Sequence, residues 1–198
     1  MNKSRLEAFS DGVIAIIITI MVLELRIPEG TSLETLRPVL PVFLSYVLSF
    51  VFLGIYWSNH HHLMQAVRHV NGSILWANLH LLFWLSLTPA IMGWMGETHF
   101  APWPVAAFGI VMFMSAVAYF ILTRTLLAEH ERDSALAVAL GRDFKGKISI
   151  VSYVLGIAAA FWRPGVACGV YILVAVMWLV PDRRFERTLR QKTENHPS

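Results

Sequence analysis

Six apolar stretches dominate this sequence, and each is a candidate for a helix that crosses a membrane. A spanning helix needs about 20 mainly apolar residues. Composition agrees, because 56% of the 198 residues are hydrophobic and only 15% are charged, which is too apolar for a soluble domain of this size. The sequence therefore predicts an all-α integral membrane protein with six transmembrane helices. The expected spans are Arg5–Ile27, Val39–His60, Ile74–Trp94, Pro104–Thr123, Ile148–Trp162 and Val166–Val180.

The distribution of basic residues predicts the orientation. If the N-terminus is cytoplasmic, 13 of the 16 Lys and Arg residues fall in inside segments, and only Arg26, Arg37 and Arg163 fall in outside loops. This positive-inside bias predicts an even number of spans and places both termini in the cytoplasm. The formal net charge of +3 then indicates topology and contact with membrane lipids, and it does not require nucleic acid as a partner.

The chain is expected to form one transmembrane domain over residues 1–181, followed by a polar cytoplasmic tail over residues 182–198. The longest connection, Leu126–Lys147, contains "SALAVAL", which is expected to form a short interfacial helix. The sequence shows neither an internal repeat nor a helix broken at mid-membrane, two features that are typical of secondary transporters. Any pore with rotational symmetry must therefore be built from several copies of the chain.

The first span has two different faces. Because successive helix residues turn by about 100°, Ser10 and Asp11 lie about 120–140° around the helix from Ile16. An apolar stripe with one hydroxyl occupies the side of Ile16. It consists of Ile16, Thr19, Ile20 and Leu23, and Phe9 and Gly12 share its side. Such a stripe is either an ordinary packing or lipid-facing surface or the lining of a narrow apolar constriction that gates a channel by expelling water. Periodicity alone leaves both interpretations open.

Three motifs resemble one known family. "RLEAFSD" (Arg5–Asp11) matches the R-x-x-x-F-S-D motif of the endolysosomal transmembrane potassium channel family and its bacterial homologues. "WSNHHHL" resembles the family's W-x-x-H-x-x-L on the second helix, here with Trp57 and His60. "NLHLLFWLSLTPA" resembles an Asn-Leu segment that ends near a proline, here Asn78 and Pro89. The chain is identified by this resemblance, over its first three spans, as a bacterial homologue of the family.

The resemblance implies a homotetrameric channel in the bacterial inner membrane, with six helices per chain. It would passively conduct K⁺ and other monovalent cations, with K⁺ preferred over Na⁺. Four copies of the first helix would line the pore, with Ile16, Ile20 and Leu23 at the constriction and the Thr19 hydroxyl influencing selectivity. The sequence contains no T-V-G-Y-G filter. Because Ile and Leu cannot replace an ion's hydration shell, the sequence offers no physical account of selectivity.

On its other face, the first helix is expected to carry a polar clamp. An acid beside a bilayer needs partners that offset its burial cost. The candidate partners of Asp11 are His60, the Trp57 indole and Arg5, with Asn78 nearby. The predicted structural or gating clamp, which holds the pore helix against the second and third helices, consists of Arg5, Phe9, Ser10, Asp11, Trp57, His60 and Asn78.

Other sites and functions are weighed against this channel. Consecutive histidines on a helix point about 100° apart, so His60–His62 are not expected to bind a metal together, and no metal or cofactor is predicted. The main rival function is a secondary transporter with Asp11 and His60 as a proton relay. A membrane enzyme would need a nucleophile and base at one depth, which the sequence does not supply.

Two further polar positions lie outside these motifs. Glu24 is either part of a cation-concentrating mouth or a solvated helix end. His80 and Trp84 share a helix face and are expected to make a packing contact at most.

Overall fold

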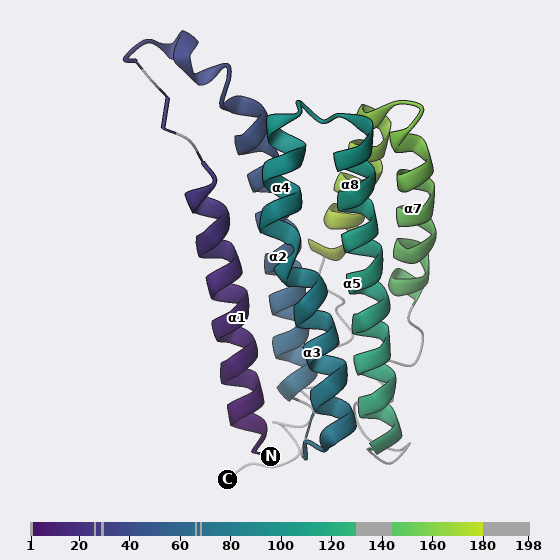
Figure 1. Cartoon of the computed structure of the whole chain (residues 1–198). Coiled ribbons are helices and arrows are strands. Elements are labelled where there is room, and N and C mark those ends of the chain that lie inside the picture. The colour runs from purple at the N-terminus through teal and green to yellow at the C-terminus, as the bar shows by residue number, and fades with distance from the viewer. Residues whose placement is uncertain are drawn as a thin grey trace, which may run out of the picture.

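A computed structural model describes residues 2–25, 27–28, 30–65, 67, 69–129 and 144–179 of the chain. These residues form an up-and-down bundle of helices (Figure 1). The helices are α1 (Lys3–Leu23), α2 (Leu40–Gln65), α3 (Gly72–Ser86), α4 (Thr88–Glu97), α5 (Pro102–Glu129), α7 (Phe144–Ala160) and α8 (Pro164–Leu179), and a short 3-10 helix, η1 (Leu33–Leu36), precedes α2. The predicted interfacial helix at residues 134–140 and the tail at residues 182–198 lie outside the described residues.

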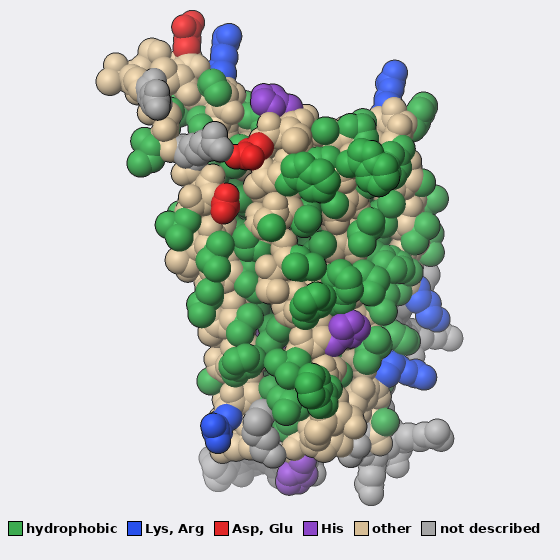
Figure 2. Space-filling view, in the orientation of Figure 1, with side chains coloured by type: hydrophobic (Ala, Val, Ile, Leu, Met, Phe, Trp, Pro, Cys, Tyr) green, Lys and Arg blue, Asp and Glu red, His purple; other side chains and the backbone are tan. Residues whose placement is uncertain are grey.

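Within the described residues, four helical stretches are long and apolar enough to cross a membrane, which confirms a multi-pass helical protein. They are Lys3–Leu23, Leu40–Gln65, Gly72–Glu97 and Pro102–Ala128. The last two predicted spans are helical as well, but α7 has 17 residues and α8 has 16. Figure 2 shows hydrophobic side chains over the middle of the visible face, with most charged side chains toward its two ends. This distribution is what a bilayer core between two aqueous phases requires.

Four predicted helix bounds were wrong by four to six residues, namely the ends of α1, α2 and α5 and the start of α7. Helix α1 ends at Leu23 rather than Ile27, and Pro28 keeps Ile27 itself out of helical geometry. Helix α5 continues to Glu129 rather than ending at Thr123. The leucines and alanine that follow Arg124 are strong helix formers and extend the helix.

The third span is broken, contrary to the expectation that no helix is interrupted at mid-membrane. Helix α3 ends at Ser86 and α4 begins at Thr88, with Leu87 between them. Pro89 has no backbone N–H to donate to the Leu85 carbonyl, and its ring crowds that carbonyl. The Leu87 N–H instead donates to the Trp84 carbonyl at 3.3 Å, a tighter turn that interrupts the α-helical pattern.

The packing divides the bundle into two regions. Helix α1 lies at one edge of the bundle in Figure 1 and packs on α2, α3 and α4. At the opposite side, α5 packs on α7 and α7 packs on α8. Tyr171 of α8 fills the junction of these three helices, because a side-chain carbon added at Gly109 or Gly156 would overlap its ring or hydroxyl. Its hydroxyl donates to the Val105 carbonyl at 3.3 Å.

Candidate pore helix and its polar contacts

Helix α1 buries one side and leaves the other uncovered. Its buried residues are Leu6, Ser10, Ile14, Ile17 and Met21. In contrast, Ile16 is 60% exposed and Leu23 is 79% exposed. We call the side formed by Ile16, Thr19, Ile20 and Leu23 the uncovered stripe, since all four are exposed. The acid and the stripe therefore face different surroundings, as the helical geometry predicts.

The hydroxyl within the uncovered stripe is oriented by its own helix. The Thr19 Oγ1 donates to the Ala15 carbonyl at 2.8 Å. Since this bond uses the hydroxyl's proton, the lone pairs of Thr19 Oγ1 remain to accept from another group or a cation. Phe9 lies on the same side and is 52% exposed, so it shares the surface of the stripe rather than the buried contacts of Ser10.

The carboxylate of Asp11 is paired with the indole of Trp57. The Trp57 Nε1 donates to Asp11 Oδ1 at 3.0 Å, and Asp11 itself is half-buried. Of the candidate partners that the sequence suggests, the structure thus joins Trp57 to Asp11. The Arg5 side chain is exposed, and within the described residues it forms no ion pair.

A second set of polar contacts, which is fully buried, involves Ser10, the residue before Asp11. The Asn78 Nδ2 of α3 donates to Ser10 Oγ at 2.9 Å, and Asn78 Oδ1 lies 2.7 Å from His60 Nε2. The Ser10 hydroxyl in turn donates to the Leu6 carbonyl at 2.9 Å. Because Asn78 Oδ1 accepts, His60 Nε2 is the protonated nitrogen of this contact. One amide therefore joins α1, α2 and α3, and His60 Nδ1 remains buried without a hydrogen-bond partner among the described residues.

Two contacts near the start of α1 were missed by the sequence interpretation. His61 Nδ1 lies 3.3 Å from Glu7 Oε1, and Lys3 Nζ donates to the Gln65 carbonyl at 3.3 Å. The signal was available, because Glu7 lies four residues before Asp11, a spacing that places two side chains on one helix face. These contacts hold the start of α1 against the end of α2.

The three consecutive histidines diverge. His60 is buried against Asn78, His61 lies beside Glu7 and stacks on Trp57 with ring centroids 6.0 Å apart, and His62 is exposed. In the part of the chain that the structure describes, no group of three or more His, Cys, Asp or Glu could hold a metal ion.

Two other polar residues were weighed from the sequence. The expectation that His80 and Trp84 make only a packing contact was wrong, because the Trp84 indole donates to His80 Nε2 at 3.0 Å. The i, i+4 spacing brings the two rings close enough for this bond. Glu24 is exposed at the C-cap of α1, and its carboxylate lies beside Gly93 of α4.

Comparison with known proteins places this arrangement in a family. A family model described as "Endosomal/lysosomal potassium channel TMEM175" matches residues 5–89, which include every residue of the stripe and the contacts of Ser10 and Asp11. A potassium channel from Chryseobacterium sp. (strain P1-3) is 58% identical over 191 residues, covering 96% of this chain and 100% of that protein. The Gallus gallus endosomal/lysosomal proton channel TMEM175 is 28% identical over 150 residues, covering 68% of this chain and 30% of that protein.

The fold agrees with these sequence matches. The crystal structure of a lysosomal potassium-selective channel TMEM175 homolog from Chamaesiphon minutus superposes with a TM-score of 0.76. It is 23% identical in sequence, and the match covers 90% of this chain and 96% of that chain. The family comprises channels and not enzymes, and the family prediction made from the three motifs is confirmed. The chain belongs to the TMEM175 channel family.

Proposed function

We propose that the chain is one subunit of a homotetrameric potassium channel, whose pore is lined by α1 from each of four copies. The observation that carries this proposal is the uncovered stripe, an apolar helix side with one hydroxyl that no other part of the described subunit covers. In a tetramer this side faces the symmetry axis. The names of the bacterial relatives support K⁺ as the permeant ion.

The constriction in this proposal is formed by Ile16, Ile20 and Leu23. A ring of such side chains closes a channel because water leaves a narrow apolar tube and ions cannot follow. Thr19 lies within this segment, and its lone pairs supply a polar position for a partly hydrated cation. No cofactor takes part in this passive conduction.

The polar contacts of α1 form the clamp that keeps the uncovered stripe directed at the axis. Ser10 is fixed through Asn78 to His60, and Asp11 is fixed to Trp57. Two anchors on adjacent residues restrict rotation of α1 about its own axis. In this proposal the exposed Arg5 and Phe9 lie at the cytoplasmic mouth, beside the clamp rather than within its buried contacts.

The proposed topology has six crossings, both termini in the cytoplasm, and a bacterial inner membrane as the host. At about 1.5 Å per residue, α7 and α8 are about 24–26 Å long, slightly short of a hydrocarbon core of about 30 Å. Lys147 lies in the first turn of α7 and Arg163 lies between α7 and α8, and long basic side chains near helix ends accommodate a mismatch of this size.

The test is reconstitution of the purified chain into liposomes, with ion flux measured under K⁺ and Na⁺ gradients. We expect passive flux that follows the electrochemical gradient, a reversal potential that follows K⁺, and a tetramer by native mass spectrometry. Equal K⁺ and Na⁺ flux would overturn the selectivity, and a monomer that conducts ions would overturn the shared pore.

A second candidate function is proton permeation, which two observations favour. The vertebrate relative is named a proton channel, and the buried contacts Ser10–Asn78–His60 form a chain of hydrogen-bonding groups beside the pore helix. A pH-sensitive dye inside the same liposomes separates the candidates. Proton entry without K⁺ favours a proton channel, whereas slow, saturating K⁺ flux that needs a proton gradient favours the rival transporter with Asp11 and His60 as its relay.

A further inference from the structure

Two buried hydroxyl groups near the break in the third span have no hydrogen-bond partner. They belong to Ser49 of α2 and Thr88 of α4, both 0% exposed, and within the described residues neither oxygen forms a hydrogen bond. The neighbouring hydroxyl of Ser45, one turn before Ser49, is satisfied and lies near two carbonyls. A buried hydroxyl without a partner is costly, so Ser49 and Thr88 each require a group that accepts their proton.

The two hydroxyls lie at one depth of the bundle. Helix α2 and the third span run antiparallel (Figure 1), and the Ser45 hydroxyl donates to the Met92 carbonyl of α4 at 3.1 Å. Ser49 follows Ser45 by one helical turn and Thr88 precedes Met92 by one turn, so both steps lead to the same depth. Residues four apart also share a helix face. Ser49 and Thr88 therefore meet at the seam between α2 and α4.

A backbone carbonyl at this depth has lost its usual donor. In an unbroken helix the Leu85 carbonyl would accept from the N–H of residue 89, but Pro89 has no N–H. Because helical carbonyls point toward the C-terminus of their helix, the Leu85 oxygen is directed toward the level of Pro89 and Thr88. Leu85 is also 0% exposed. Membrane proteins satisfy carbonyls freed by a proline with neighbouring hydroxyls and with ordered waters.

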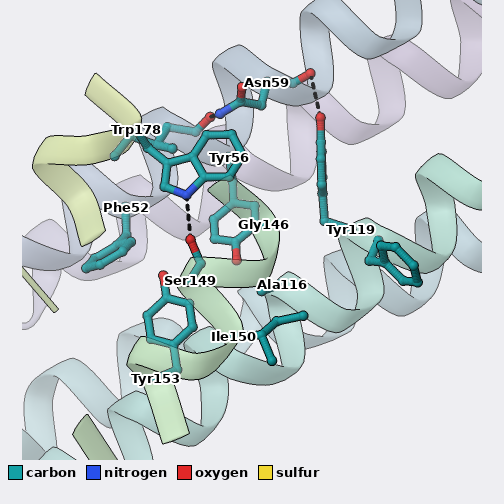
Figure 3. A pocket seen from close by; sticks show the side chains of 12 residues that line it. Phe52, Tyr56, Asn59, Ala116, Tyr119, Gly146, Ser149, Ile150, Tyr153 and Trp178 are labelled. Carbon is teal, nitrogen blue, oxygen red and sulfur yellow. Dashed lines mark hydrogen bonds between the residues drawn. The ribbon is translucent and has the colours of Figure 1, made fainter. Parts of the chain in front are cut away.

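The cavity shown in Figure 3 does not serve these groups. It has a volume of about 40 Å³ and lies between α2, α5, α7 and α8. Its wall includes neither of the two unpartnered hydroxyls. The Ser149 hydroxyl on its wall already accepts a 2.8 Å hydrogen bond from the Trp178 indole (Figure 3). The seam at the break is therefore a separate site.

The chemistry of the three groups selects a neutral ligand. Two hydroxyls and one carbonyl carry no formal charge. The end of α3 is partly negative and the start of α4 is partly positive, so the two helix dipoles offset each other at the break. The ligand must accept from the hydroxyls and donate to the carbonyl, which a water molecule does and a cation cannot. Because the hydroxyls do not bond to each other, they have the separation that a bridging water fills.

We propose that one ordered water molecule lies between α2 and the break in the third span. It accepts from the hydroxyls of Ser49 and Thr88 and donates to the Leu85 carbonyl. A buried water makes about three hydrogen bonds, which is the number that these groups offer. The water supplies the donor that Pro89 lacks, so the span bends at this point without leaving a bare carbonyl inside the bundle.

The first experiment detects the water by X-ray hydroxyl-radical footprinting of the full chain in detergent, read by tandem mass spectrometry. Radicals formed from a bound water oxidise the side chains that touch it, even where bulk water does not reach. Leu85 should be oxidised faster than Leu81, which lies one turn earlier on α3 and is also buried. Equal rates would overturn the proposal. This comparison needs no variant, so poor folding of a variant does not obscure it.

The second experiment uses the sign of a change in melting temperature. Ser49→Ala should lower the melting temperature by about 2–4 °C, as the loss of one hydrogen bond implies for a chain of this size. Without the water, the same change removes a hydroxyl that has no partner, so an unchanged or higher melting temperature would contradict the proposal.

Ser115→Ala is the matched control for Ser49→Ala. Ser115 of α5 is equally buried and its hydroxyl also lacks a partner among the described residues, but no proline follows it in α5. Its replacement should not lower the melting temperature. Equal losses from the two variants would show an effect common to buried serines and would remove the assignment to the break.

Pro89→Ala supplies the missing donor and tests the carbonyl contact. Its new N–H can bond to the Leu85 carbonyl in place of the water, so oxidation of Leu85 should fall, and Ser49→Ala should no longer lower the melting temperature in this background. A full loss in that background would exclude the Leu85 carbonyl as a partner. The melting curves are repeated in K⁺ and in choline, and a loss from Ser49→Ala that appears only in K⁺ would show a cation at the break instead of water.

Discussion

The Trp57 indole of α2 donates a 3.0 Å hydrogen bond to the Asp11 carboxylate of α1. Trp57 is 46% exposed, whereas the adjacent contact of Ser10 with Asn78 is fully buried. The two anchors therefore differ in their surroundings. An exposed hydrogen bond to a charged group is partly screened by water, while a buried neutral contact has no alternative partner. This difference determines how each should respond to substitution.

Trp57→Phe is expected to destabilise the subunit by about 1–2 kcal/mol, because the carboxylate of Asp11 loses its donor but can still be hydrated. Asp11→Asn should cost less, since its remaining amide oxygen still accepts from the indole. A double-mutant cycle measured by thermal unfolding in detergent should couple Asp11 to Trp57 by about 0.5–2 kcal/mol, and more strongly than Asp11 to His60. The K⁺/Na⁺ preference should stay nearly intact; a selective change in it from Asp11→Asn alone would place the acid in the pore.

Asn78→Leu should be more damaging, with a loss of about 2–5 kcal/mol, because Ser10 and His60 both lose their partner in a buried site. Thermal unfolding of the purified assembly measures this loss. Asn59→Leu is the matched control, because among the described residues the Asn59 side chain bonds only to the Ile55 carbonyl of its own helix, and it should cost less than about 1 kcal/mol. Similar losses for both substitutions would contradict the connecting role of Asn78.

Replacing Leu23 or Ile16 with Asn should hydrate the constriction, raise conductance and weaken selectivity, because a polar ring removes the barrier to water. Single-channel recording in planar bilayers measures both quantities. Leu155→Asn on α7 is the control, since Leu155 is 61% exposed but lies away from α1. Unchanged currents in both α1 variants would count heavily against the pore assignment.

Gly109→Ala should destabilise the subunit by about 1–3 kcal/mol, because the new methyl group meets the Tyr171 hydroxyl. Gly169→Ala is the matched control in α8, where an added carbon meets no atom within 4 Å, and it should be neutral or stabilise by up to about 1 kcal/mol. Adding Tyr171→Phe to Gly109→Ala should recover part of the loss in thermal stability, because the nearest clashing atom is then removed. Additive losses would show that the strain lies elsewhere.

The two faces of α1 could be predicted because they depend on one helix only. The angle between Asp11 and Ile16 is fixed by helical geometry. The buried and the exposed residues of α1 lie on the two sides that this angle separates. The partner of Asp11 could not be fixed in the same way, because Trp57 and His60 both lie on α2 and the choice depends on how two helices are rotated against each other. Sequence spacing therefore restricted the partners without selecting one.

Other features needed contacts between distant segments. Pro89 is visible in the sequence, but whether a proline ends, bends or breaks a long apolar run depends on the neighbours that satisfy the freed backbone groups. The packing of Tyr171 against Gly109 joins α8 to α5, two helices that are far apart in sequence. The cavity wall likewise draws on four helices, so no local pattern indicated it.

The break at Leu87 gives the third span two arms with separate attachments. The arm formed by α3 is tied through Asn78 to Ser10 and His60, whereas the arm formed by α4 is tied through the Met92 carbonyl to Ser45 of α2 at 3.1 Å. A tilt imposed on α4 can be absorbed by the dihedral angles at Leu87 before it reaches Asn78. The span therefore behaves as a jointed rod rather than a stiff one, so a tilt of α4 reaches the contacts of Asn78 less directly than it would through a continuous helix.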